Sequence, residues 1–523
     1  MSFLTIPLTI LEAIFVFALD LPVRAGYTLD GEKRRTVVPW GDITQNTKGT
    51  KEFIRAANSL FLASRHLHEI VAPLFYSRTT FAFEDVDCLG AFLDTIGASN
   101  RQSLRYVAIN LEREDPSKDD GGYDEGVLTA TFLRKTTQTL SNLPVALRAM
   151  WIYFPFEERS LAIDEETGTV HQPLRAALQR FKGIEELALV GYPHEVIWDI
   201  LCDSKGCLGA KKEVSPVFLS LSALRLEGRL PSTVGSVGLT AALSVANLPC
   251  LTHLEFQGLD DKAGSEDQAE PSFLADAIQA MRPLQTFRWL RGSEPYSRAF
   301  RGPPVPQLLH DLHLRALISR HMDTLREVEI DLAGSLARAY AMGITAGSLA
   351  AVLNSLTDLQ RATIVAPFLD LVKLFQAIVG SDANNSLSPL PSRHTLFRSL
   401  ESLRLTLGSE EDTLNIALDS GELSRLFLCT NLYKVSQFRL RVVIGTRPEI
   451  TKFVRSHKIL RDNVKLYPEL EQALLACMTE RRHRSSILTN GEKKQAARED
   501  WWALSLVDVY DYSPFWDDVR DVW

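Results

Sequence analysis

A short apolar motif recurs along most of this chain of 523 residues, and no other feature restricts its possible folds as strongly. The motif places apolar side chains at the first, fourth and sixth of six positions, as in Leu251, Leu254 and Phe256. Its last two apolar positions alternate, as a short strand requires when one of its faces is buried. The other copies begin 30 to 43 residues apart, at Leu104, Leu147, Ile184, Leu221, Leu284, Leu325, Leu359, Leu400 and Val435.

Segments with helical periodicity lie between the copies, for example residues 273–284, 308–325 and 348–356, whose apolar residues form one stripe. A strand, a turn and a returning helix make up the unit of a leucine-rich-repeat solenoid, in which stacked units share one core. We therefore expect an α/β fold in which short parallel strands alternate with helices, as an irregular solenoid of this kind. The alternative is an ordinary α/β domain whose strands carry the pattern, because the asparagine of regular leucine-rich repeats is missing from nearly every copy.

Two segments near the start of the chain carry a different pattern. Residues 6–19 open with an Ile-Pro pair and continue with apolar residues at helical spacing. Residues 59–76 place a Ser-Arg pair between two apolar helices and end in Pro-Leu-Phe-Tyr. Together these segments resemble the two halves of an F-box, especially that of fungal F-box proteins with trailing repeats.

The resemblance implies a function in binding. An F-box docks on the Skp-family adaptor of a cullin ubiquitin ligase, so the chain would be the substrate-recognition adaptor of an SCF complex. Its repeats would then bind a substrate protein, which the sequence does not identify. Apolar residues of the box would contact or support the Skp-family protein: Ile6, Pro7, Leu8, Ile10, Leu11, Ile14, Phe15, Leu19, Leu62, Leu67, Pro73 and Leu74.

Two alternatives remain open beside this interpretation. Ile10, Ile14 and Phe15 could each serve core packing alone, because apolar residues are most often buried. The whole chain could also be a leucine-rich-repeat interaction scaffold that does not recruit a ligase.

The sequence predicts three parts. Residues 1–82 would form a small helical F-box-like unit, in which residues 20–58 are an inserted loop, because they contain Gly and Pro and few apolar residues. Residues 83–445 would form the solenoid. Residues 446–523 would form a helical cap and an acidic tail that holds four of the eight tryptophans. That tail either packs on the last repeat or binds a partner.

Composition narrows the possible partners and the compartment. The net charge of −8 argues against general nucleic-acid binding. The dispersed cysteines, with no Cys-x-x-Cys pair, indicate reduced thiols and a cytoplasmic or nuclear location, or both. The apolar stretch at residues 3–19 is short for a membrane span and contains Pro7 and Glu12, so we expect no membrane insertion.

Motifs for catalysis or metal binding are not evident. The sequence has no Gly-x-Gly-x-x-Gly, Walker, Gly-x-Ser-x-Gly or His-Glu-x-x-His motif. His310 and His313 lack a third nearby ligand, Cys202 and Cys207 lack a second pair, and the acidic stretch from Asp115 does not match a calcium loop. We therefore expect a binding protein that is not an enzyme and holds no cofactor or metal.

Overall fold

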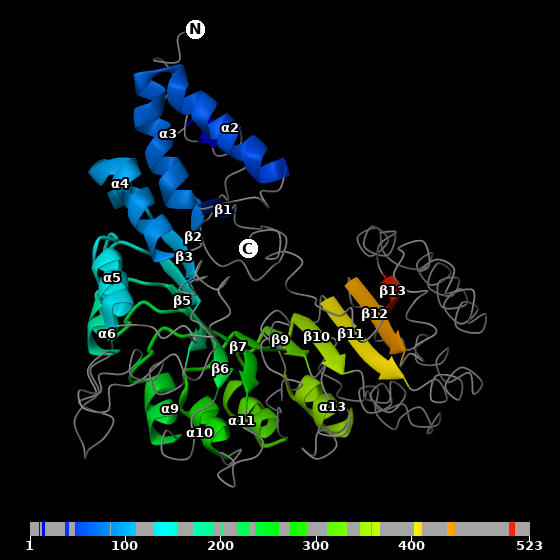
Figure 1. Cartoon of the computed structure of the whole chain (residues 1–523). Helices are drawn as coiled ribbons and strands as arrows, with labels where there is room; N and C mark the ends of the chain where they lie inside the picture. The colour runs from blue at the N-terminus through cyan, green and yellow to red at the C-terminus, as the bar shows by residue number, and fades with distance from the viewer. Residues whose placement is uncertain are drawn as a thin grey trace, which may run out of the picture. The chain divides into compact units, whose positions relative to one another are not determined.

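The computed structural model describes residues 10, 13–15, 37–40, 48–83, 85–110, 130–153, 171–192, 201, 217–229, 236–260, 272–290, 311–331, 346–356, 358–366, 402–409, 437–444 and 502–507. They form an α/β fold in which parallel strands alternate with helices, as expected (Figure 1). The chain divides into two compact units, one within residues 1–251 and the other within residues 252–513. We describe each unit by itself.

The first unit is a row of parallel strands in which each strand pairs with the next one along the chain. Helices α4, α5 and α6 lie along one side of these strands (Figure 1). The elements are β1 (Val37–Trp40), α2 (Lys48–Ala63), α3 (Arg65–Arg78), β2 (Thr80–Phe83), α4 (Val86–Ser103), β3 (Tyr106–Asn110), α5 (Ala130–Ser141), β4 (Ala149–Tyr153), α6 (His171–Gln179), β5 (Glu186–Tyr192), β6 (Ala223–Arg229) and α9 (Ser236–Leu243).

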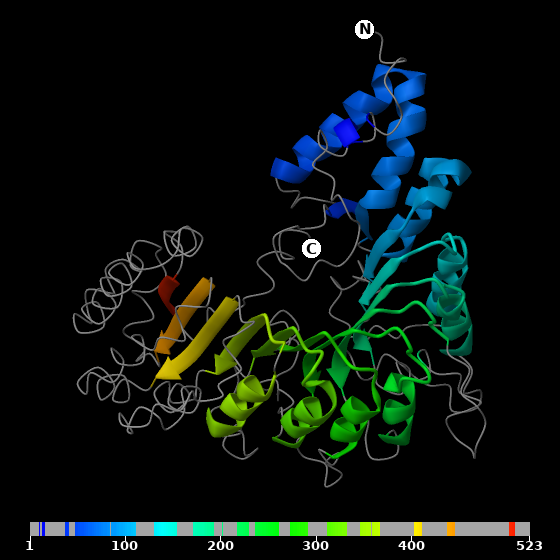
Figure 2. The same ribbon diagram turned by 180° about the vertical axis from the view of Figure 1, so that it is seen from behind.

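The second unit repeats this design, and its strands also pair in parallel with their sequence neighbours. Both ribbon views place α10, α11 and α13 on the same side of the strands (Figures 1 and 2). The elements are β7 (His253–Asp260), α10 (Ser272–Ala280), β8 (Thr286–Leu290), α11 (Asp311–His321), β9 (Glu327–Asp331), α13 (Ala346–Ser355), β10 (Arg361–Ala366), β11 (Ser402–Ser409), β12 (Gln437–Ile444) and β13 (Trp502–Val507).

The apolar motif predicted the strands correctly. Each of the strands β3 to β12 begins two residues after the first apolar position of one copy, as β7 does at His253 after Leu251. The three helical segments predicted from periodicity are confirmed as α10, α11 and α13. Even the residues of the weakest copy, Leu359, Ala362 and Ile364, are buried, and the last two belong to β10.

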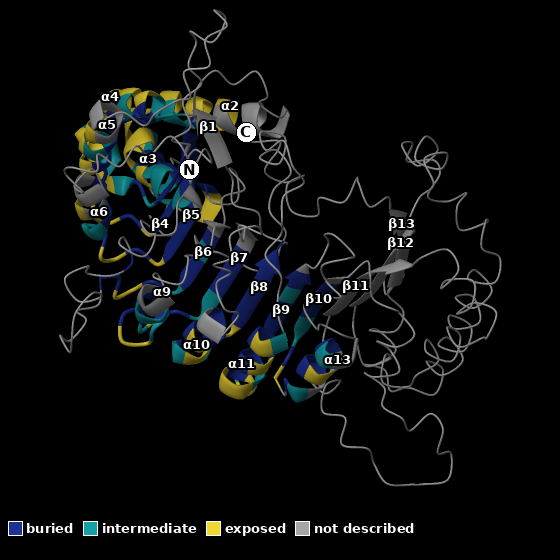
Figure 3. Cartoon of the chain, turned by 60° about the horizontal axis from the view of Figure 1, so that its bottom comes forward, coloured by how far each residue is buried: buried dark blue, intermediate teal, exposed yellow. Residues whose placement is uncertain are grey.

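The strand register stacks equivalent positions of the motif into columns. In the second unit Leu254 is opposite Phe287, Phe287 is opposite Val328, and Val328 is opposite Ala362. All four side chains are buried. These columns form the core between the strands and the helices. Figure 3 shows β8 and its neighbours as mostly buried. Burial of several Leu, Phe and Val side chains in each repeat supplies most of the stabilisation, at about 1.5–3 kcal/mol each.

A repeated backbone contact joins neighbouring repeats where each strand begins. The carbonyl of Arg148 accepts hydrogen bonds from the N–H groups of Glu185 and Glu186, at 2.7 and 3.0 Å. In the second unit the carbonyl of Gln285 accepts from Arg326 and Glu327 in the same way, at 2.8 and 3.0 Å. Each carbonyl has two lone pairs, so this pairing satisfies two N–H groups before the regular strand ladder starts.

The prediction of an inserted loop at residues 20–58 is wrong where those residues are described. Residues 37–40 form β1, which pairs in parallel with β2, and residues 48–58 belong to α2. Pro39 suggested a break, but β1 pairs with β2 alone among the described strands, and proline is tolerated on such an edge strand. In α2 the helix continues through Ala57, which is buried, so residues taken as loop contribute to the core.

The row of strands also extends beyond the predicted solenoid of residues 83–445. In the first unit β1 and most of β2 precede that range, and in the second unit β13 follows it, within the predicted Trp-rich tail. Trp502 is opposite Phe438 in the register, which continues the column of motif positions. The division into three domains itself stays a prediction.

Candidate functional site

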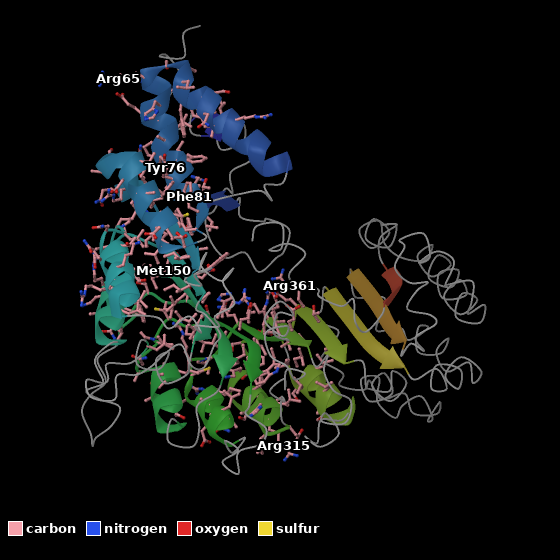
Figure 4. All side chains as sticks on the ribbon, in the orientation of Figure 1. Arg65, Tyr76, Phe81, Met150, Arg315 and Arg361 are labelled. Carbon is pink, nitrogen blue, oxygen red and sulfur yellow. The ribbon has the colours of Figure 1, made fainter. Side chains whose placement is uncertain are left out.

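The helices α2 and α3 carry the second half of the F-box-like pattern. They pack against each other and are joined at Ser64, whose side chain accepts a hydrogen bond from the N–H of Leu67 at 3.1 Å. Ser64 has extended backbone angles and is the N-cap of α3, so the serine of the Ser-Arg pair begins the second helix. Arg65, the other member of the pair, is exposed and forms an ion pair with Glu69 at 3.1 Å (Figure 4).

A chain of aromatic rings anchors these helices to the first strands. Phe61 of α2 contacts Phe75 of α3 edge to face, with ring centroids 5.4 Å apart. Phe75 contacts Phe81 of β2 at 5.6 Å, and Phe81 contacts Phe92 of α4 at 5.0 Å. Edge-to-face and tilted ring pairs of this kind add to the apolar burial. The inner sides of α2 and α3 are therefore fixed by packing.

Several predicted adaptor-binding residues lie on exposed surfaces. The side chain of Leu62 is 86% exposed at the end of α2, and those of Ile10 and Ile14 are 51% and 42% exposed. Residues 10 and 13–15 are helical, as predicted. Pro73 is exposed within α3, whereas Leu67 and Leu74 are half-buried.

The other predicted adaptor-binding residues divide into two groups. Phe15 is buried, which fits its alternative interpretation as a core residue. The remaining five lie outside the described residues: Ile6, Pro7, Leu8, Leu11 and Leu19.

The second surface lies on the strands of the second unit. Side chains between the apolar motif positions point away from the core, and on four neighbouring strands they are charged. We call them the charged face: Glu255, Arg288, Glu327, Glu329 and Arg361. Figure 4 shows Arg361 on the side of the strands away from α11, and Arg315 on the outer side of α11.

Arg288 is the centre of the charged face. Its Nη2 donates a hydrogen bond to Oε1 of Glu327 at 2.7 Å, its Nε lies 3.4 Å from Oε2 of Glu329, and its Nη1 lies 3.7 Å from Oε2 of Glu255. Glu327 also accepts from Arg361, whose Nη2 lies 2.9 Å from Oε2. Arg288, Glu255 and Glu327 are buried, whereas Glu329 and Arg361 are more exposed. Within the charged face, Arg361 is therefore the most exposed side chain and Glu329 the next.

The charged face was not predicted from the sequence. Its residues are spread over more than a hundred positions and look like ordinary surface residues when each repeat is taken alone. A signal was nevertheless present, because aligning the copies of the motif places Glu255, Arg288 and Glu329 at the same position. The strand register brings these positions side by side.

The residues considered as metal ligands do not gather in the described part of the chain. There, no group of three or more His, Cys, Asp or Glu side chains is placed to hold a metal ion. His313 is buried and its ring stacks on Trp289 with centroids 5.8 Å apart. His310, Cys202, Cys207 and the acidic stretch from Asp115 lie outside the described residues.

Comparison with models of known protein families gives no match, and comparison with curated proteins gives none either. The resemblance to F-box proteins therefore depends on the residues of this chain alone. Among the helices that the structure describes, none combines the length and the hydropathy needed to cross a bilayer.

Proposed function

We propose that this chain is the substrate-recognition adaptor of an SCF-type ubiquitin ligase, with an F-box-like helical unit followed by an irregular leucine-rich-repeat solenoid. The observation that carries the proposal is the exposure of Ile10, Ile14 and Leu62, apolar residues at positions that the F-box pattern assigns to adaptor contact. Removing these side chains from water in an apolar interface would stabilise a complex.

Three further features support the proposal. The Ser-Arg pair lies at the junction of α2 and α3, so the second half of the F-box-like pattern corresponds to a pair of packed helices. In the first unit these helices are followed directly by β2 and then by alternating helices and strands, so a docking element adjoins a repeat surface. In the second unit the charged face offers fixed charges to a substrate protein by electrostatic complementarity.

A pair of surface variants tests the docking role. Leu62→Asp should weaken binding of the full chain to a Skp-family protein by roughly tenfold or more, because a charge would enter an apolar interface. It should leave the fold intact, since the Leu62 side chain is almost fully exposed. Binding is measured by titration of the purified full-length chain against the purified Skp-family protein.

Leu219→Asp is the matched control, because Leu219 is an exposed leucine of the first unit outside the F-box-like segments. It should bind the Skp-family protein with the affinity of the unchanged chain. Equal weakening by both variants would contradict a specific docking role for Leu62.

The second candidate function is an interaction scaffold that does not recruit a ligase. The charged face supports it equally, because this surface does not depend on the F-box-like helices. A full-length chain that is folded but does not bind any Skp-family protein from its own source would favour the scaffold.

A further inference from the structure

A cavity of about 470 Å³ lies in the first unit, at the edge where helices end and the next strands begin. It is lined by residues at the end of α4, in the turn between α5 and β4, and after α6. Its polar side chains include Arg101, Gln102, Asn142 and Arg180. Val145, an exposed apolar residue, forms part of its wall. None of these residues belongs to the F-box-like segments or to the charged face.

The two arginines of the cavity are held in place by backbone carbonyls. Nη2 of Arg101 donates to the carbonyl of Leu93 at 2.8 Å, and Nη1 of Arg180 donates to the carbonyl of Ser141 at 2.6 Å. Each bond uses one of the five N–H donors of a guanidinium. Nε of Arg101 is buried and makes no hydrogen bond within the described residues. Both side chains are thus oriented, and each guanidinium keeps N–H donors that these two bonds do not use.

The same edge carries more positive than negative charge. Nη1 of Arg105 donates to the carbonyl of Gln102, a residue of the cavity, at 2.7 Å. Burial lowers the pKa of Arg105, and the positive charge of Arg148 lowers it further. Asp94 lies 3.7 Å from Arg101, and Glu185 lies 3.6 Å from Arg148. Within the described residues, Arg105 and Arg180 form no ion pair.

A structural role explains only part of this arrangement. In the second unit Nε of Arg320 donates to the carbonyl of Met281 at 3.1 Å, as Arg180 does to Ser141. Basic residues commonly satisfy the last carbonyls of a helix in this way. One arginine is enough for that contact, so it does not account for the additional positive charge around the cavity. The excess of guanidinium donors beside an apolar wall is suited to carboxylates next to an apolar side chain.

We propose that this cavity binds an acidic segment of a partner protein. Carboxylates of the segment pair with Arg101 and Arg180, and an adjacent apolar side chain covers Val145. The site is separate from the F-box-like helices, so it can be present whether or not the chain recruits a ligase.

The test is a titration of the full-length chain with a short fluorescein-labelled peptide of glutamate, serine and leucine, followed by anisotropy. The peptide should bind, and its affinity should fall as salt is added, because these charges are partly exposed. A peptide with glutamine in place of glutamate should bind at least about tenfold more weakly. Failure of the acidic peptide to bind, or equal binding of both peptides, would overturn the proposal.

The double variant Gln102→Glu with Val145→Glu tests whether the acidic peptide binds in this cavity. Both residues are exposed, so the chain should stay folded while two carboxylates enter the cavity. We expect the affinity for the acidic peptide to fall roughly tenfold or more. Leu219→Glu, outside the cavity, should leave the affinity unchanged. Unchanged binding by the folded double variant would show that the peptide binds elsewhere and would refute the site.

Discussion

Arg288→Met should lower the free energy of unfolding of the second unit by about 3–5 kcal/mol, the usual cost of removing one partner from a buried ion pair. The substitution leaves the buried carboxylates of Glu255 and Glu327 without the guanidinium that lies between them. Arg361 still pairs with Glu327, so the loss falls chiefly on Glu255 and Glu329. Hydrogen exchange of the amides in β7 to β10, measured on the full-length chain, reports this loss.

A surface ion pair in the same unit supplies the control. Arg315 pairs with Asp311 at 2.6 Å, but its side chain is 75% exposed, against 8% for Arg288. Arg315→Met should therefore cost at most about 1 kcal/mol. Adding Glu255→Gln to Arg288→Met should restore part of the stability, because it removes a buried negative charge that has lost its ion pair with Arg288. Equal costs for the two methionine variants would contradict the account of the charged face.

His321 should make stability depend on pH in the mildly acidic range. Burial lowers the pKa of His321 to about 4, and the nearby charge of Arg320 lowers it too, while the hydrogen bond to Ile278 opposes the shift. In the unfolded chain His321 has the ordinary pKa of 6.5, so as the pH falls it is protonated in the unfolded state before it is protonated in the folded state. Stability from this residue is therefore complete above about pH 6.5 and is lost as the pH falls toward 4, by about 3 kcal/mol.

The geometry around His321 explains why the neutral ring is required. Its Nδ1 accepts a hydrogen bond from the N–H of Leu284 at 3.1 Å, so its Nε2 carries the proton and donates to the carbonyl of Ile278 at 3.0 Å. Protonation of Nδ1 would break the first bond inside the core.

Urea unfolding of the full-length chain at several pH values measures the effect. His321→Leu should remove this part of the pH dependence and cost about 2–4 kcal/mol at neutral pH, because two backbone groups lose their partner. His66→Asn, at an exposed histidine, should keep the pH profile of the unchanged chain. An identical loss between pH 6.5 and 4 in the His321→Leu variant would show that other groups cause it.

The strands could be predicted because their signal is local. A strand with one buried face needs alternating apolar residues, and the motif records this requirement within six positions. For the same reason α10, α11 and α13 could be predicted from one apolar stripe each. β13 also has alternating Trp502, Leu504 and Leu506, but it lacks a copy of the apolar motif, and the tail around it is rich in Trp and Asp.

The charged face and the cavity depend on information that a single repeat does not hold. Arg288 and Glu327 are 39 positions apart in the sequence, and only the strand register brings them within hydrogen-bond distance. The contact of Arg180 with Ser141 likewise crosses from one repeat to the next. β1 was not predicted for another reason. Pro39 and the nearby glycines are typical of a loop, and β1 forms by pairing with β2, which the residues of β1 alone do not indicate.

The most direct test of the proposed function is whether the purified full-length chain forms a complex with a purified Skp-family protein of its own source. Size-exclusion chromatography with light scattering gives the mass of the complex. The proposal predicts one stable complex of equal stoichiometry, which Ile14→Asp combined with Leu62→Asp abolishes while the circular dichroism spectrum is unchanged. Separate elution of the folded chain and the Skp-family protein at every concentration would contradict it.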